Sequence, residues 1–259
     1  MTSSALPFRE IRSRFVRPEG PLFGALRAVR LALETAHGMV RVQLAHVNGG
    51  EAAARETFAD VAERLADVFG VRVELRGTLS GEAHEIRVAN HTSYLDILVL
   101  SAARGGRFLS RHDVEGWMIV GRVASQIGCL FVDRDSHSAR AGALRKLGRA
   151  ASDGAPLLVF PEGKTSGGEL HPFQRGAFAV ARSAGVPVRP LAILYDDVDE
   201  VAWVGDATLL PHVWKRLCGG YVRAEVLPLE VLHAEGRTAA ALSDAARDAI
   251  AAALGRRVG

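Results

Sequence analysis

The chain has 259 residues, of which 48% are hydrophobic and 24% charged, and its formal net charge is +3 at pH 7. This length and apolar content allow one sizeable core, in one large domain or in two small ones. The two cysteines do not form a disulfide framework, so the composition argues against a disulfide-stabilised secreted protein and indicates a reducing compartment.

The first 50 residues form a basic arm. They contain seven arginines against three glutamates, which gives a net charge of +4 and exceeds that of the whole chain. Residues 1–20 lack the apolar run of a signal peptide, so we do not expect secretion. From Pro21 to Val47 apolar residues recur at helical spacing, but charged residues interrupt them every few positions, so this helix should not span a membrane.

The amphipathic pattern of this arm has two interpretations. Its apolar face and adjacent arginines could lie in a membrane interface, where anionic lipids attract the cations. Alternatively, the apolar face packs against the rest of the protein and the arginines face water. A turn at Asn48–Gly50 leads into a second expected helix, Glu51–Phe69. We divide the chain here, into an arm at residues 1–50 and a second domain at residues 51–259.

Behind the arm, short apolar runs alternate with helix-like segments. We expect strands at Val71–Arg76, Glu85–Ala89, Arg107–Ser110, Cys129–Val132, Leu157–Phe160, Val188–Leu194 and Tyr221–Leu227, and helices near Tyr94–Ala103, Ser138–Ala151, Gln174–Ala184 and Thr238–Leu254. This alternation predicts an α/β fold, with a mostly parallel layered sheet flanked by helices. We expect the remaining run, Trp203–Cys218, to lie in the core, with a place beside a substrate channel as the alternative.

The turn Asn90–Asp96 joins a strand-like run to a helix-like one and carries an imidazole and a carboxylate. Histidine titrates near neutral pH, and a nearby carboxylate can hold its tautomer and stabilise the imidazolium that forms when it accepts a proton. We therefore expect His91 and Asp96 to act together as a catalytic base. Alternatively, Ser93 caps the helix and Asp96 returns a hydrogen bond to the Ser93 backbone N–H, which leaves His91 an ordinary turn residue.

Three further segments follow in order, each at an end of an expected strand. They are Phe131-Val132-Asp133-Arg134, Phe160-Pro161-Glu162-Gly163-Lys164-Thr165-Ser166 and Val186-Pro187-Val188-Arg189-Pro190. With the Asn90–Asp96 turn they resemble the four ordered motifs of the glycerolipid acyltransferase superfamily, typified by 1-acylglycerol-3-phosphate acyltransferases. The resemblance covers about Val71 to Tyr195, and four ordered motifs are far more specific than one.

This resemblance implies transfer of a fatty acyl group from a thioester of acyl carrier protein or coenzyme A to a lysolipid hydroxyl. His91 would remove the hydroxyl proton during attack on the thioester carbonyl, and Asp96 would orient the ring. No acyl-enzyme is expected, because no Gly-x-Ser-x-Gly elbow or cysteine motif is evident. Lipid substrates favour the membrane interpretation of the arm, so we expect a peripheral protein at the cytoplasmic face of the inner membrane.

The same resemblance implies that the acceptor's head group contacts Arg134, Glu162, Gly163, Lys164, Thr165 and Ser166. Phosphate-accepting members commonly have Thr-Arg-Ser after Glu-Gly, whereas here the cation stands one position early, at Lys164. Lyso-ornithine lipid acyltransferases resemble this chain in having threonine where that arginine would be. We expect 1-acylglycerol-3-phosphate as the acceptor, with lyso-ornithine lipid as the alternative. A catalytically idle membrane-binding module is the alternative of another class.

Other kinds of site have less support. A P-loop would need glycine in place of Leu158, and no Gly-x-Gly-x-x-Gly evidently follows a strand, so we expect no nucleotide-binding motif. The nine histidines are scattered, without His-Glu-x-x-His or paired Cys-x-x-Cys, so we expect no metal and no cofactor beyond the acyl donor. We expect no nucleic-acid partner. Two further residues are of interest: His171, close after the Glu162–Ser166 turn, and Arg189, which either contacts an anionic head group or extends to the surface.

Overall fold

The sheet is the centre of the fold. The computed structural model describes residues 18–79, 84–112, 116, 120–132, 148, 150, 155–205 and 207–255. Its strands are β1 (Val71–Leu75), β2 (Ile86–Ala89), β3 (Arg107–Arg111), β4 (Leu130–Val132), β5 (Leu157–Val159), β6 (Val188–Tyr195) and β7 (Val222–Pro228). They form one sheet in the order β1-β7-β6-β2-β5-β3-β4, and only the β6–β7 pair is antiparallel. The expected α/β fold with a mostly parallel sheet is confirmed.

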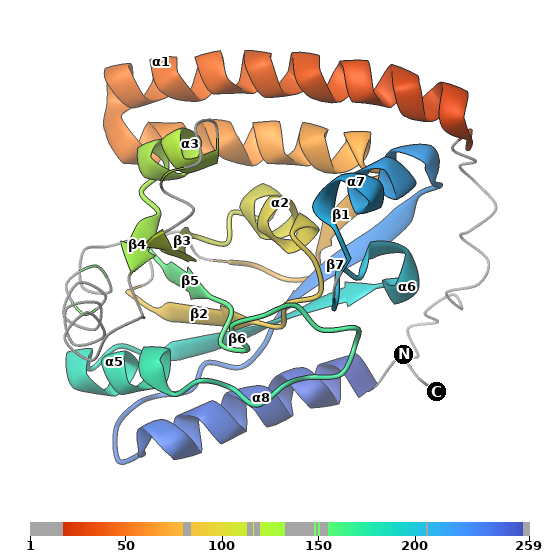
Figure 1. Ribbon diagram of the computed structural model, residues 1–259. Helices are drawn as coiled ribbons and strands as arrows, with labels where there is room; N and C mark the ends of the chain where they lie inside the picture. The colour runs from red at the N-terminus through yellow and green to blue at the C-terminus, as the bar shows by residue number, and fades with distance from the viewer. Residues whose placement is uncertain are drawn as a thin grey trace, which may run out of the picture.

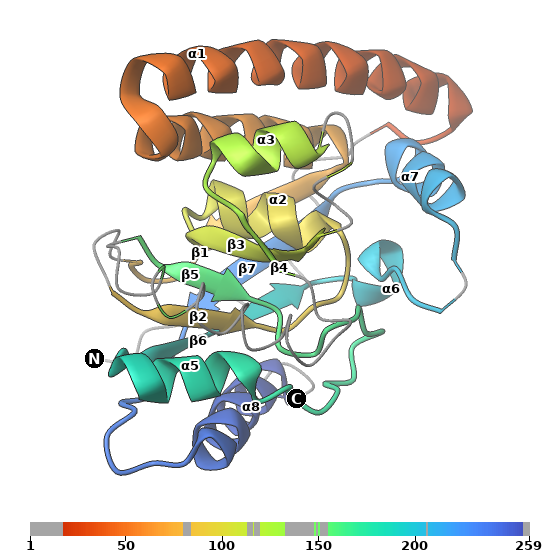
Figure 2. The ribbon, with the colours of Figure 1, turned by 60° about the vertical axis from the view of Figure 1, so that its left-hand side comes forward.

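Helices cover both faces of this sheet. They are α1 (Pro21–Val68), α2 (Leu95–Ala102), α3 (Val120–Gln126), α5 (Gly176–Ala184), α6 (Val198–Val201), α7 (Leu209–Cys218) and α8 (Ala239–Gly255). Helices α1, α2 and α3 lie on one side of the sheet, and α5 and α8 lie on the other (Figures 1 and 2). The strands serve both layers because successive side chains point to opposite faces. On β5, Leu157 and Val159 pack in the cluster with α5 and α8, whereas Leu158 packs in the cluster with α2.

The positions of the strands follow the sequence closely. Each expected strand is present, and its ends differ from the expected ones by at most one residue. Helix α2 begins at Leu95, one residue later than expected, and α7 is a regular helix within the run Trp203–Cys218, to which no element was assigned. The expected helix Ser138–Ala151 lies almost wholly outside the described residues.

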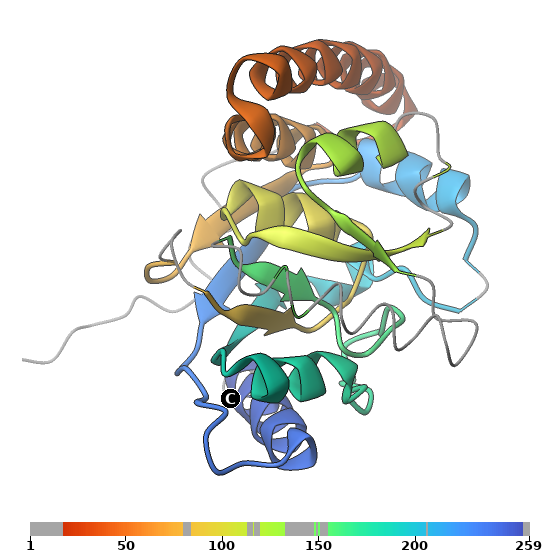
Figure 3. The same ribbon diagram turned by 90° about the vertical axis from the view of Figure 1, so that its left-hand side faces the viewer.

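The arm and the expected second helix together form a helical hairpin (Figure 3). Gly50 interrupts the helix with φ of 68° and ψ of −163°, a conformation that glycine adopts without the steric cost of a Cβ atom. The two halves lie so close that a Cβ atom on Gly38 would stand 2.5 Å from Cγ1 of Val61. The second half of α1 packs against α2 (Figure 1), which fixes the hairpin to the sheet layer.

The outer half of α1 carries an exposed apolar surface, as the membrane interpretation of the arm requires. Its large apolar residues are exposed at helical spacing, as an arm stripe composed of Leu22, Leu26, Val29, Leu33, Val40, Leu44 and Val47. Its arginines contact the protein: Arg27 donates to the Leu217 carbonyl at 2.6 Å, and Arg30 pairs with Asp67 at 2.8 Å. The packed alternative therefore holds for one side of this helix, where Leu31 and Val42 lie in core clusters, but not for the arm stripe, which is exposed. No helix in the described part of the chain is long and apolar enough to cross a membrane.

Candidate active site

The Asn90–Asp96 turn after β2 meets the Glu162–Ser166 turn after β5 because these two strands are neighbours in the sheet. Strands β2 and β5 are parallel, with Ile86 opposite Leu157 and Val88 opposite Val159. The carboxyl ends of parallel strands reach the same edge of a sheet, which is where open α/β sheets place their ligand sites. The turn after β2 therefore stands beside the turn after β5. Strand β6 flanks β2 on its other side and ends at the same edge.

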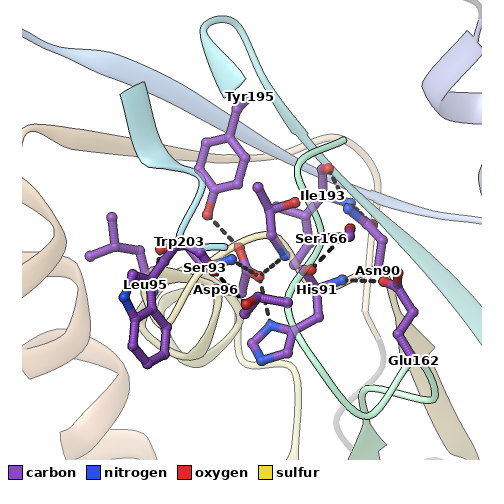
Figure 4. Close-up of polar contacts among 12 residues, drawn as sticks. Asn90, His91, Ser93, Leu95, Asp96, Glu162, Ser166, Ile193, Tyr195 and Trp203 are labelled. Carbon is purple, nitrogen blue, oxygen red and sulfur yellow. Dashed lines mark hydrogen bonds and ion pairs between the residues drawn. The ribbon is translucent and has the colours of Figure 1, made fainter. Parts of the chain in front are cut away.

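At this edge His91 and Asp96 are in direct contact (Figure 4). The Nδ1 atom of His91 lies 2.9 Å from Oδ2 of Asp96, whose residue is 0% exposed. The same Oδ2 accepts the backbone N–H groups of Thr92 at 2.6 Å and Ser93 at 2.9 Å. The Ser93 contact is the one expected of a capping aspartate. This bond and the imidazole contact, stated as parts of two alternatives, are both present on one oxygen. The expected Ser93 cap is not, because the N-cap of α2 is Tyr94, without a side-chain capping hydrogen bond.

These hydrogen bonds define which nitrogen of His91 carries a proton. An ionised carboxylate only accepts hydrogen bonds, so Nδ1 donates to Asp96 and, in the neutral ring, Nε2 keeps its lone pair. The ring of His91 stacks on the ring of Phe160, with centroids 4.0 Å apart and an interplanar angle of 12°. The His91 side chain is 17% exposed, so the site is partly enclosed and still open to a substrate.

The turn after β5 holds the backbone of His91 on both sides. The Glu162 carboxylate accepts the His91 N–H at 2.7 Å and the His171 N–H at 2.9 Å, one on each oxygen. Ser166 donates its own N–H to the His91 carbonyl at 2.7 Å and its hydroxyl to the same carbonyl at 3.2 Å. Glu162 and Ser166 are both buried and therefore serve as supports for His91. His171 contributes its backbone N–H to this arrangement.

The tip of the same turn is open to solvent. Gly163 and Lys164 are exposed, and Gly163 has φ of 74°, which favours glycine. Thr165 donates its hydroxyl to the Trp203 carbonyl, and the Trp203 N–H donates to the Thr92 carbonyl at 3.1 Å. Direct contact of the head group with all five residues of the turn stays a prediction, with Gly163 and Lys164 the exposed members. The sixth expected head-group residue, Arg134, lies outside the described residues.

Three residues of the site were missed by the sequence reasoning. Trp203 links the two turns through its backbone, Phe160 stacks on His91, and Tyr195 donates its phenol O–H to Oδ1 of Asp96 at 2.6 Å. For Tyr195 a signal was present in the sequence. The period of two along β6 puts it on the same face as Leu191 and Ile193, which pack with α2, and Asp96 belongs to the first turn of α2.

Cys129 and the possible metal ligands of the described residues offer no alternative chemistry. Burial raises the pKa of the Cys129 thiol to about 12, so this cysteine stays protonated near neutral pH and is a poor nucleophile. In the part of the chain that the structure describes, no cluster of three or more histidine, cysteine or acidic side chains could hold a metal ion.

Comparison with known proteins places the chain in a family. Residues 70–194 match the family described as Acyltransferase. A lyso-ornithine lipid O-acyltransferase of Pseudomonas aeruginosa is 37% identical over 194 residues, which are 72% of each chain. A 1-acyl-sn-glycerol-3-phosphate acyltransferase of Neisseria gonorrhoeae is 32% identical over 110 residues, 42% of this chain and 43% of that protein.

The fold has a counterpart among solved structures. The crystal structure of the 1-acyl-sn-glycerophosphate acyltransferase PlsC from Thermotoga maritima superposes with a TM-score of 0.65 at 17% identity, covering 89% of this chain and 97% of that one. The fold is thus the α/β fold of that structure, with a histidine and an aspartate in contact at the sheet edge. By its sequence similarity, this chain belongs to the acyltransferase family and is an acyltransferase.

Proposed function

We propose that the protein transfers a fatty acyl group from an acyl thioester to a lysolipid hydroxyl by direct attack, with His91 as the general base. Nε2 of His91 takes the hydroxyl proton as the oxygen bonds to the thioester carbonyl carbon, and the proton passes to the thiolate when the carbon–sulfur bond breaks. The observation that carries this proposal is the hydrogen bond of 2.9 Å between His91 Nδ1 and Asp96, which leaves Nε2 basic.

The acceptor we propose is lyso-ornithine lipid, ahead of 1-acylglycerol-3-phosphate. The lyso-ornithine lipid acyltransferases of Pseudomonas aeruginosa and Rhodobacter capsulatus match 72% and 75% of this chain, against 42% for the Neisseria enzyme. The position after Lys164 is a threonine whose hydroxyl bonds to the Trp203 carbonyl, so no guanidinium stands there. Arg134 is the cation we propose for the carboxylate of lyso-ornithine lipid. Lys164, exposed at the tip of its turn, is the one we propose for the phosphate if 1-acylglycerol-3-phosphate is accepted instead.

Two experiments test these points together. The purified protein is offered both lysolipids with acyl carrier protein and coenzyme A thioesters, and lipid products are measured. We expect transfer, with kcat/KM more than tenfold higher for lyso-ornithine lipid, and His91→Ala should lower kcat by about 10²–10⁴-fold. His233→Ala, at an exposed histidine between β7 and α8, is the control. No transfer from any donor would favour the idle module, and acyl trapped on the protein would contradict direct attack.

We further propose that residues 1–50 attach the catalytic domain, residues 51–259, to the cytoplasmic face of the inner membrane. The arm stripe supports this proposal, since Leu26 is 60% and Leu33 66% exposed in water. Because Arg27 and Arg30 already bind protein groups, apolar insertion contributes more to attachment than these charges do.

The attachment is tested by sedimentation with vesicles. The double variant Leu26→Gln, Leu33→Gln should bind phospholipid vesicles at least fivefold more weakly than the unchanged protein. The control, Ala25→Gln with Ala32→Gln, changes exposed residues one position earlier on the helix and should bind normally. Equal sedimentation of both variants would contradict the role of the arm stripe.

A further inference from the structure

Strand β6 holds both ends of the Asn90–Asp96 turn. At the first end, the Asn90 side chain donates to the Ile193 carbonyl at 3.0 Å and accepts the Ile193 N–H at 2.8 Å. At the second end, two residues further along the strand, Tyr195 donates to Asp96 at 2.6 Å. Figure 4 shows these contacts reaching the turn from one strand. The segment that carries His91 is therefore fixed at both ends by residues on one face of β6.

We propose that Tyr195 is a positioning residue for catalysis, whose phenol O–H fixes Oδ1 of Asp96 and so keeps Oδ2 directed at His91 Nδ1. This inference rests on the proposed function, because it assigns Tyr195 a role through the catalytic base. Tyr195 does not contact the reacting atoms itself; it sets the plane of the carboxylate that orients the imidazole.

The distribution of donors on Asp96 supports this role. Oδ2 accepts three hydrogen bonds, from the His91 ring and from the backbone N–H groups of Thr92 and Ser93. Tyr195 is the donor to Oδ1 within the described residues. A carboxylate rotates as one rigid group about its Cβ–Cγ bond, so the Tyr195 bond to Oδ1 adds to the three bonds on Oδ2 in holding the carboxylate plane. Asp96 is 0% exposed, so water cannot easily replace the phenol.

The phenol remains a donor throughout the range in which such an enzyme is assayed. Burial, and then the adjacent Asp96 carboxylate, raise the pKa of Tyr195 well above its ordinary value. A group that stays protonated cannot itself produce a limb in the pH–rate profile near neutrality. Any change of that profile when the hydroxyl is removed therefore reports on the His91–Asp96 pair.

Removal of the hydroxyl should move the acid limb of kcat/KM to higher pH, by two effects of the same sign. Without a donor on Oδ1, more negative charge remains on the carboxylate, which stabilises the imidazolium of His91 and so favours the protonated, inactive base. The less stabilised carboxylate also accepts a proton more readily, which removes the partner of His91 Nδ1. A role in stability alone would leave the limb where it is.

The test is Tyr195→Phe in the full-length protein. We expect kcat to fall about 10–100-fold, the effect of losing a hydrogen bond to a charged group, with the KM values for donor and acceptor changed less than twofold. The acid limb should move to higher pH. Tyr221→Phe is the matched control, because the Tyr221 phenol also donates to a carboxylate, that of Asp67 at 3.4 Å, away from the site.

A second variant separates positioning from other effects. If Tyr195 acts through Asp96, Tyr195→Phe should cost less than threefold in kcat when it is added to Asp96→Asn. A full additional loss in that background, or an unmoved acid limb in the single variant, would overturn the inference. Failure of the proposed function is distinguishable, since His91→Ala would then retain activity whatever the result at Tyr195.

Discussion

The two ends of β2 carry charged networks that differ in one respect. At the amino end, both oxygens of Glu85 accept hydrogen bonds from arginines, Arg87 at 2.7 Å and Arg189 at 3.0 Å, and Arg87 is 0% exposed. At the carboxyl end, Asp96 accepts four hydrogen bonds, and its partner His91 keeps one unprotonated nitrogen beside solvent. The two networks therefore differ in that only the one at the carboxyl end offers the basic nitrogen that the proposed catalysis requires.

The same comparison explains Arg189. The sequence left two interpretations, contact with an anionic head group or extension to the surface. In the structure Arg189 lies opposite Arg87 in the parallel β2–β6 register and pairs with Glu85. It therefore lies toward the amino edge of the sheet, away from His91, with its guanidinium paired to the buried Glu85.

The largest effect should come from breaking the amino-end network. Arg87→Met leaves the Glu85 carboxylate buried with one arginine, and loss of a buried partner costs about 3 kcal/mol of stability or more. We expect a lower urea midpoint and unchanged turnover per folded molecule. Arg104→Met, which removes exposed pairs with Glu56 and Asp60, should cost less than about 1 kcal/mol. A loss of turnover in folded Arg87→Met would contradict the expectation that the amino-end network affects stability and not the reaction.

A smaller effect, and one on the rate, should follow at the carboxyl end. Asp96→Asn keeps the shape of the side chain but removes the charge that stabilises the imidazolium of His91. We expect kcat to fall about 10²-fold, which is about 2.7 kcal/mol at 1.36 kcal/mol per factor of ten. Stability should change less than in Arg87→Met, and His91→Ala should be the more severe variant in steady-state assays. Equal turnover of Asp96→Asn and the unchanged protein would remove Asp96 from the mechanism.

The smallest effect should come from the exposed tip of the turn after β5. Lys164→Ala should raise the acceptor KM about tenfold if the ammonium binds the phosphate of 1-acylglycerol-3-phosphate. A tenfold rise corresponds to the weakest charge-assisted hydrogen bonds. With lyso-ornithine lipid, which lacks a phosphate, we expect less than a threefold rise. The donor KM should be unchanged. Lys215→Ala, on α7, is the control, and a large rise in the donor KM would move Lys164 to the thioester site.

The sequence by itself determined those features that depend on residues close together along the chain. Short apolar runs placed each strand to within one residue, because the central strands of a parallel sheet are buried on both faces and so read as continuous apolar segments. The His91–Asp96 contact joins residues five apart across one turn, so the local order of strand, turn and helix already brings them together. The motif order was enough to indicate the acyltransferase family, which the comparisons confirmed.

The tertiary structure alone decided which distant groups meet. Glu162 contacts His91 across 71 residues and Tyr195 contacts Asp96 across 99, and local periodicity does not predict such partners. The same holds for the arm, where pattern predicted an apolar face and only the packing of the helical hairpin showed that this face is exposed while Arg30 pairs with Asp67. Local propensity is set by neighbours along the chain, whereas a buried hydrogen bond depends on the register and order of strands, which form only when the whole core is assembled.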